Sequence, residues 1–89
     1  MKEQYIVQCK DKKERKYLYT FLINNDYILI HNFTYQRVLN SAFPFVIEPN
    51  NTFWICESIT CCAAAYANNG IISFNEFINL YQLMTRTQL

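Results

Sequence analysis

The sequence predicts a small α+β protein: a mostly antiparallel sheet of three to four strands, with helices packed on one face. Short β-branched and aromatic segments indicate the strands, and apolar residues at helical spacing indicate the helices. The predicted order is β-α-β-β-β-α-α, which fits a helix-on-sheet layer arrangement. With 89 residues, 52% of them hydrophobic and 17% charged, the chain is long enough for one modest core, and we expect a single domain over residues 1–89.

The first strand and the first helix have the clearest local signals. Residues 4–10 are β-branched and aromatic with a polar rim, and their alternation puts three side chains on one face: Tyr5, Val7 and Cys9. Residues 12–24 follow as a helix, because Asp11 is a good N-cap with Glu14 three positions later. Leu18, Phe21 and Leu22 lie at the spacing of one helical face. The polar run Asn24-Asn25-Asp26 ends the helix.

The middle of the chain predicts three strands. Residues 27–33 contain three consecutive apolar β-formers and predict the second strand. Residues 34–42 leave two possibilities open, a short helix or a meandering loop. Residues 43–48 and 53–57 predict a hairpin around a Pro-Asn-Asn-Thr turn. Pro44 favours either an edge position or the first residues of its strand.

The last third of the chain predicts two helices. Residues 58–67 are small and apolar, typical of a close-packed helix that stops near Gly70. Ser73 and Glu76 then form an S-x-x-E capping box. The residues after the cap have helical spacing through about Met84: Phe74, Phe77, Ile78 and Tyr81.

Residues 65–77 resemble the back half of an EF-hand calcium loop, with Gly70 at the sharp turn and Glu76 at the closing position. The first and third ligand positions are Ala65 and Ala67, which offer calcium no side-chain oxygen. We therefore expect no calcium site, and we interpret the segment as a helix stop followed by a capped helix start.

The composition argues against several kinds of site. The net charge of +1 provides no global field toward nucleic acid or an anionic membrane. No leader peptide or membrane-length apolar run is present, so we expect a cytoplasmic protein with reduced cysteines.

The cysteines (Cys9, Cys56, Cys61 and Cys62) lack paired zinc spacing, so we expect no metal and no cofactor. The single histidine, His31, leaves an enzyme that uses a cysteine and His31 as the third and lowest-ranked hypothesis.

Two features favour binding. Five basic residues between Lys10 and Lys16 face two acidic ones, a local net charge of +3 at the start of the first helix. Fifteen aromatic residues exceed what so small a core needs, and tyrosine and tryptophan are preferred at protein interfaces. We predict that partner contacts come from both groups: Lys12, Lys13, Arg15, Lys16, Tyr19, Tyr35 and Trp54. The alternative is a small nucleic-acid-binding or regulatory module that uses Lys10–Lys16 with Tyr17 and Tyr19.

The sequence resembles small proteins of phages and prophages of low-GC Gram-positive bacteria. Three segments carry the resemblance: the end of the first helix at Asn24–Tyr27, the strand over residues 43–47, and the segment 70–77. This resemblance implies a non-enzymatic inhibitor or modulator of a bacterial host or defence protein, similar to anti-CRISPR proteins. A homodimer is a further expectation, because a small body with this many apolar residues leaves some exposed. The resemblance carries over no site residue.

Overall fold

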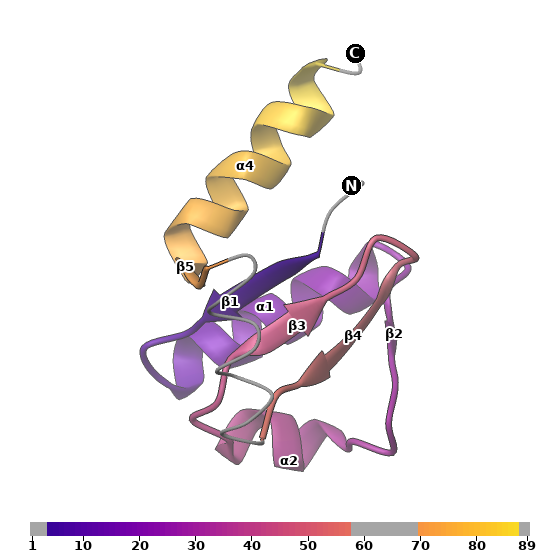
Figure 1. The fold of residues 1–89 in the computed structure, drawn as a ribbon, viewed down its shortest axis with the longest axis vertical. Helices are drawn as coiled ribbons and strands as arrows, with labels where there is room; N and C mark the ends of the chain where they lie inside the picture. The colour runs from indigo at the N-terminus through magenta and orange to yellow at the C-terminus, as the bar shows by residue number, and fades with distance from the viewer. Residues whose placement is uncertain (1–3, 58–69, 88–89) are drawn as a thin grey trace.

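The structure is a computed structural model that describes residues 4–57 and 70–87. Its elements follow one another as shown in Figure 1: β1 (Tyr5–Gln8), α1 (Lys12–Asn24), β2 (Ile28–Leu29), α2 (Tyr35–Asn40), β3 (Phe45–Ile47), β4 (Thr52–Ile55), β5 (Ile72–Ser73) and α4 (Phe74–Thr87). The predicted helix over residues 58–67, with Cys61 and Cys62, lies outside the described residues.

The α+β class is confirmed, but the predicted sheet is wrong in size and in direction. The sheet has five strands in the order β2-β4-β3-β1-β5, and it is mixed. The pairs β1/β3 and β3/β4 are antiparallel, whereas β1/β5 and β2/β4 are parallel. Two strands are only two residues long, too short to show an alternating pattern, and parallel neighbours are joined by long connections that no local pattern reveals.

Strand β5 is the element that sequence reasoning missed. Ile72 and Ser73 were interpreted as a packing residue and a helix cap, yet they also pair with Val7 and Gln8 of β1. The chain therefore passes from β5 directly into α4. Because β5 is the edge strand beside β1, α4 starts at this edge of the sheet (Figure 1).

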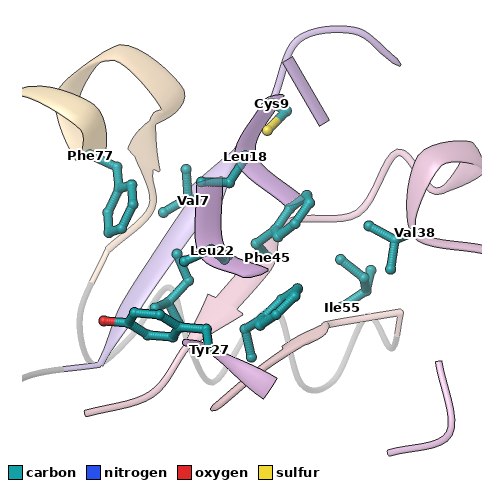
Figure 2. Packing of buried hydrophobic residues seen from close by; sticks show 11 residues of the cluster. Val7, Cys9, Leu18, Leu22, Tyr27, Val38, Phe45, Ile55 and Phe77 are labelled. Atoms are coloured by element: carbon teal, nitrogen blue, oxygen red, sulfur yellow. The ribbon is translucent and has the colours of Figure 1, made fainter. Parts of the chain in front are cut away.

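The main core lies between the sheet and the helices (Figure 2). Leu18 and Leu22 of α1 are fully buried against it, as the predicted helical face requires. Helix α2 contributes Val38, and α4 contributes Phe77. The sheet side of this core comes from alternating positions of three strands: Val7, Phe45, Ile47, Phe53 and Ile55. All three described helices thus contact the same face of the sheet.

The opposite face of the sheet has its own smaller cluster. Ile6, Val46 and Cys56 are buried there, with Trp54 and Ile71 packed against them. These residues alternate with those of the main core along β1, β3 and β4, as the two-residue period of a strand requires. The Trp54 side chain therefore points away from α1.

The predicted caps of the first and last helices are confirmed. Asp11 Oδ1 accepts a hydrogen bond from the Glu14 backbone N–H at 2.9 Å, which starts α1. Ser73 Oγ accepts from the Glu76 N–H at 3.1 Å, and the Ser73 N–H donates to Glu76 Oε1 at 3.5 Å. Gly70 has a φ of +70°, a left-handed conformation that glycine adopts without strain.

The ambiguous stretch 34–42 contains a short helix. Helix α2 covers Tyr35–Asn40, and Thr34 caps it by accepting from the Arg37 N–H at 3.2 Å. The hairpin of β3 and β4 is confirmed, with Phe45 opposite Ile55. Pro44 precedes β3, which lies inside the sheet, so of its two predicted placements the strand start is the correct one.

Candidate interaction surface

The outward side of α1 combines charge with an exposed ring. Because an α-helix turns about 100° per residue, burying Leu18 and Leu22 places Lys12, Lys13, Lys16 and Tyr17 on the solvent side. The Tyr17 side chain is 57% exposed, high for a tyrosine in a protein this small. We call these four residues the α1 surface.

Only part of the basic run is free to meet a partner. Lys10 Nζ lies 3.7 Å from Glu14 Oε2, and the Lys10 backbone N–H donates to Glu14 Oε1 at 3.0 Å. Arg15 Nε donates to the Leu39 carbonyl at 2.7 Å and so joins α1 to α2. Within residues 4–57 and 70–87, no carboxylate pairs with the three lysines of the α1 surface. These three ammonium groups are therefore the available charge of the run.

A groove lies beside Tyr17, between the N-terminal half of α1 and the start of α4. Its volume is about 380 Å³, and it is lined by Lys10, Asp11, Lys13, Glu14, Tyr17, Phe74 and Ile78. The rings of Tyr17 and Phe74 meet edge to face, with centroids 5.4 Å apart. The rings and Ile78 make the groove apolar between the two helices, while its rim at the start of α1 is charged. We call this hollow the Tyr17 groove.

A second hollow continues along α1 on the other side of the same ring. Its volume is about 260 Å³, and Tyr17, Thr20, Phe21, Asn24 and Asn25 line it. The Asn25 amide is already engaged, since Nδ2 donates to the Phe21 carbonyl at 2.7 Å and Oδ1 accepts from the Tyr81 hydroxyl at 3.2 Å. Tyr17 is thus shared by two hollows, one with charged residues at its rim and one lined by Thr20 and two asparagines.

The predicted aromatic contacts do not join the α1 surface. Tyr19 packs on Tyr35 at 4.8 Å between ring centroids and on Phe53 at 5.9 Å, so both tyrosines close the gap between α1 and α2. Trp54 lies on the opposite face of the sheet, where its ring meets His31 at 5.3 Å and its Nε1–H donates to Glu48 at 3.4 Å. The seven predicted residues therefore do not form one continuous surface.

Of the groups proposed for catalysis, Cys9 follows β1 and His31 follows β2, two strands that are not neighbours in the sheet. Cys9 is buried under α1, and burial, followed by the nearby Glu14 charge, raises the pKa of its thiol to about 12. A thiol held protonated in this way is a poor nucleophile. His31 is exposed just beyond β2, with a left-handed φ of 65°. Among the residues that the structure describes, no three histidines, cysteines or acids come together as metal ligands would.

A third hollow, of about 330 Å³, lies beside α2. Arg37 is on its rim, but its guanidinium makes two 2.9 Å hydrogen bonds to Glu57 and lies 4.9 Å from the centre of the Phe33 ring. The hydrogen bonds to Glu57 raise the pKa of Arg37 further above its ordinary value. The charge of Arg37 is thus neutralised by Glu57 within the protein, so this hollow offers a partner less free charge than the α1 surface does.

Sequence reasoning did not place Phe74 and Ile78 beside the basic run, and it ranked Tyr19 above Tyr17. One signal was available: Tyr17 follows Lys13 by four positions and therefore lies on the same side of the helix, away from Leu18. The position of α4 was not available, because it depends on the unpredicted pairing of β5 with β1.

Comparison with known proteins found no matching family model, no similar curated protein and no similar solved structure. Within the described parts of the chain, none of the helices combines the length and apolarity needed to cross a membrane. The described residues form a small α+β protein with a mixed sheet, an open groove lined in part by Lys13, and three lysines on α1 that no described carboxylate pairs.

Proposed function

We propose that the protein is a non-enzymatic interaction module that binds a partner protein through the α1 surface. The observation that carries this proposal is Tyr17, an aromatic side chain left exposed among three unpaired lysines and beside an apolar groove. Tyrosine is enriched among the residues that dominate binding energy at interfaces. Unpaired lysines around it favour a partner with an acidic surface and speed its approach.

The kind of partner follows from the resemblance to small phage and prophage proteins. This resemblance points to a bacterial host or defence protein as the partner. The chain would inhibit or modulate that protein by covering part of its surface, as anti-CRISPR proteins do. Such an inhibitor needs neither a cofactor nor catalytic groups. The location that fits this role is the bacterial cytoplasm. That two copies form a homodimer through exposed apolar residues stays a prediction.

Co-purification from bacterial lysate, followed by mass spectrometry, tests this function. The wild-type chain is compared with Tyr17→Ala and with the charge reversals Lys13→Glu and Lys16→Glu. Ile28→Ala is the matched control, because Ile28 is an exposed apolar residue (64%) on the edge strand β2 and lines neither hollow beside Tyr17. We expect one acidic protein to be retained stoichiometrically by wild type and control and lost from the α1 variants. If every variant retains the same proteins, the α1 surface is not the binding site.

The second candidate function is nucleic-acid binding through the lysines, with Tyr17 stacking on a base. Its support is the same set of unpaired ammonium groups on consecutive turns of α1. Arg15 and Lys10, however, are engaged within the protein, and Asp11 and Glu14 lie beside the groove. The three lysines of the α1 surface are few for a phosphate backbone, since nucleic-acid affinity grows with the number of lysine and arginine contacts, and for this reason we rank the protein partner first.

Salt dependence separates the two functions. Binding to a duplex or a single strand with a steep loss of affinity in salt, abolished in Lys12→Glu with Lys16→Glu, would establish the nucleic-acid function. A protein-interaction module shows weak affinity for both nucleic acids at physiological salt and no preference between them. Fluorescence anisotropy with labelled oligonucleotides at two salt concentrations measures the difference.

A further inference from the structure

The groove beside Tyr17 has the composition of a site for one particular kind of peptide. Tyr17 of α1 lines this groove together with Phe74 and Ile78 of α4, and its volume of about 380 Å³ is enough for a large apolar side chain. The edge-to-face contact of Tyr17 with Phe74 holds the two sides in register. An aromatic or leucine side chain from a partner would bury apolar area on both helices.

The four charges that line the groove balance, Lys10 and Lys13 against Asp11 and Glu14, so any excess positive charge comes from the neighbouring residues of α1. Glu14 is occupied by Lys10, through a backbone hydrogen bond and an ion pair, and Asp11 accepts the capping hydrogen bond of α1. Lys13 lines the same groove, and no carboxylate of the described residues pairs with it. Because residues 10–16 carry five basic and two acidic side chains, a net charge of +3, the potential around this rim still favours a carboxylate on the occupant.

The second hollow supplies what a peptide backbone needs. Beyond Tyr17, Thr20 and Asn24 line it with a hydroxyl and an amide, and Phe21 is its apolar member. Asn24 and Thr20 are both exposed, and such groups donate to and accept from peptide groups. The two hollows share Tyr17 and run along the same side of α1, so a single extended segment can occupy both.

From these observations we infer that the Tyr17 groove binds an acidic peptide segment of the partner. An apolar side chain of the segment lies in the groove against Tyr17, Phe74 and Ile78, and its neighbouring carboxylate meets Lys13. The backbone continues over Tyr17 toward Asn24. The inference rests on the proposed function and names the part of the partner that is recognised.

Two capped peptides test it, added to the full-length, isotopically labelled chain and followed by NMR. In one, a phenylalanine and a leucine are flanked by glutamates; in the other, lysines replace the glutamates. We expect the glutamate peptide to bind about five- to tenfold more tightly, since an attractive ion pair replaces a repulsive one. The largest shifts are expected at Tyr17, Phe74 and Ile78.

Charge reversal on α1 makes the test specific. Lys13→Glu is expected to reverse the preference between the two peptides. Lys16→Glu makes the same change of charge one turn of helix nearby but outside the groove, and we expect it to weaken the glutamate peptide at most about twofold. Both positions are exposed, so the folded spectrum is retained, and Lys13→Ala provides a second variant with a smaller expected effect.

The two failures are distinguishable. Equal binding of both peptides, or shifts that map to Trp54 on the opposite face, would overturn the groove inference. If the lysate partner is still lost in the Tyr17→Ala variant, the proposed function survives that result with a different mode of contact. If peptide binding follows the prediction but no lysate protein is retained, the groove is established and the proposed inhibitor function is overturned.

Discussion

The two flanks of α1 carry similar residues and have opposite roles. On one flank, Tyr19 packs against Tyr35 and Phe53, and Arg15 is bound to the Leu39 carbonyl of α2. On the other, Tyr17 is 57% exposed and Lys13 is unpaired beside an open groove. Both flanks have a tyrosine four residues after a basic residue, yet one is closed by a neighbouring helix and the other is not.

The difference comes from the neighbours of α1. Tyr17 and Tyr19 are two residues apart, about 200° around the helix, so they lie on opposite sides of the line of Leu18 and Leu22. On the Tyr19 side, α2 approaches closely enough for side chain to backbone contact. On the Tyr17 side, α4 begins at the far edge of the sheet after β5, and it leaves space. A residue's role here is decided by which helix lies opposite it.

The side of α1 between the two flanks packs into the main core, where Cys9 and Tyr27 are buried beside Leu18 and Leu22. We expect the largest effect on stability from the ionisation of these two groups. Burial raises the pKa of Cys9 from 9.0 to about 12 and that of Tyr27 from 10.0 to about 12. The folded state therefore holds these protons more tightly than the unfolded state. The stability that results is complete below pH 9 and is lost as the pH rises toward 12.

Urea unfolding at a series of pH values measures this loss. The transition midpoint should fall steadily above pH 9 in the wild-type chain. Cys9→Ala and Tyr27→Phe should each flatten part of the fall, because each removes one group that must ionise. A midpoint that stays constant up to pH 11 would mean that water reaches the side of α1 between the two flanks, and both flanks would then have to be reinterpreted.

The two tyrosines test the comparison directly. Tyr19→Ala removes a half-buried ring that contacts two others, and we expect a loss of about 2–3 kcal/mol in the free energy of unfolding. Tyr17→Ala removes a mostly exposed ring with one edge contact, and we expect a loss below about 1 kcal/mol. Chemical denaturation of both variants provides the numbers. Equal losses would show that the open flank is as much a packing site as the closed one.

The sequence was sufficient for the features that depend on local chemistry. Helix α1 has the predicted bounds because Asp11 and the Leu18–Leu22 spacing define it within a few residues. The capping box at Ser73 was predicted for the same reason. The hairpin of β3 and β4 was predicted from its turn residues.

The parallel strands and the site needed contacts that are distant in the chain. Val7 pairs with Ile72, and no pattern around either residue indicates the other. Trp54 was predicted as a contact because of its residue type, but the alternation along β4 places it on the opposite face from α1. The groove combines residues near position 13 with residues near position 76, so it appears only once β5 has positioned α4.

The basic residues allow a smaller test of the two flanks. Arg15→Met keeps the apolar stem but removes the hydrogen bond to Leu39, and we expect a loss of about 1–2 kcal/mol. Lys16→Met, the adjacent residue with an exposed and unpaired ammonium, should change stability by less than about 0.5 kcal/mol. Thermal unfolding of both variants, at equal ionic strength, compares them. A similar cost for both would contradict the assignment of Arg15 to the closed flank.

The most local effect should come from Ser73, the N-cap of α4 beside the groove. Ser73→Ala removes the acceptor for the Glu76 N–H, and we expect a loss of about 1 kcal/mol, the usual cost of an N-cap. Ser73→Thr keeps the hydroxyl and should recover most of it. Because Phe74 follows the cap immediately and contacts Tyr17, the alanine variant should also loosen the open flank while leaving Tyr19 and Tyr35 unchanged. NMR shifts confined to Tyr17, Phe74 and the first turn of α4 would support this, whereas equal shifts at Tyr19 would show that the two flanks are coupled through α1.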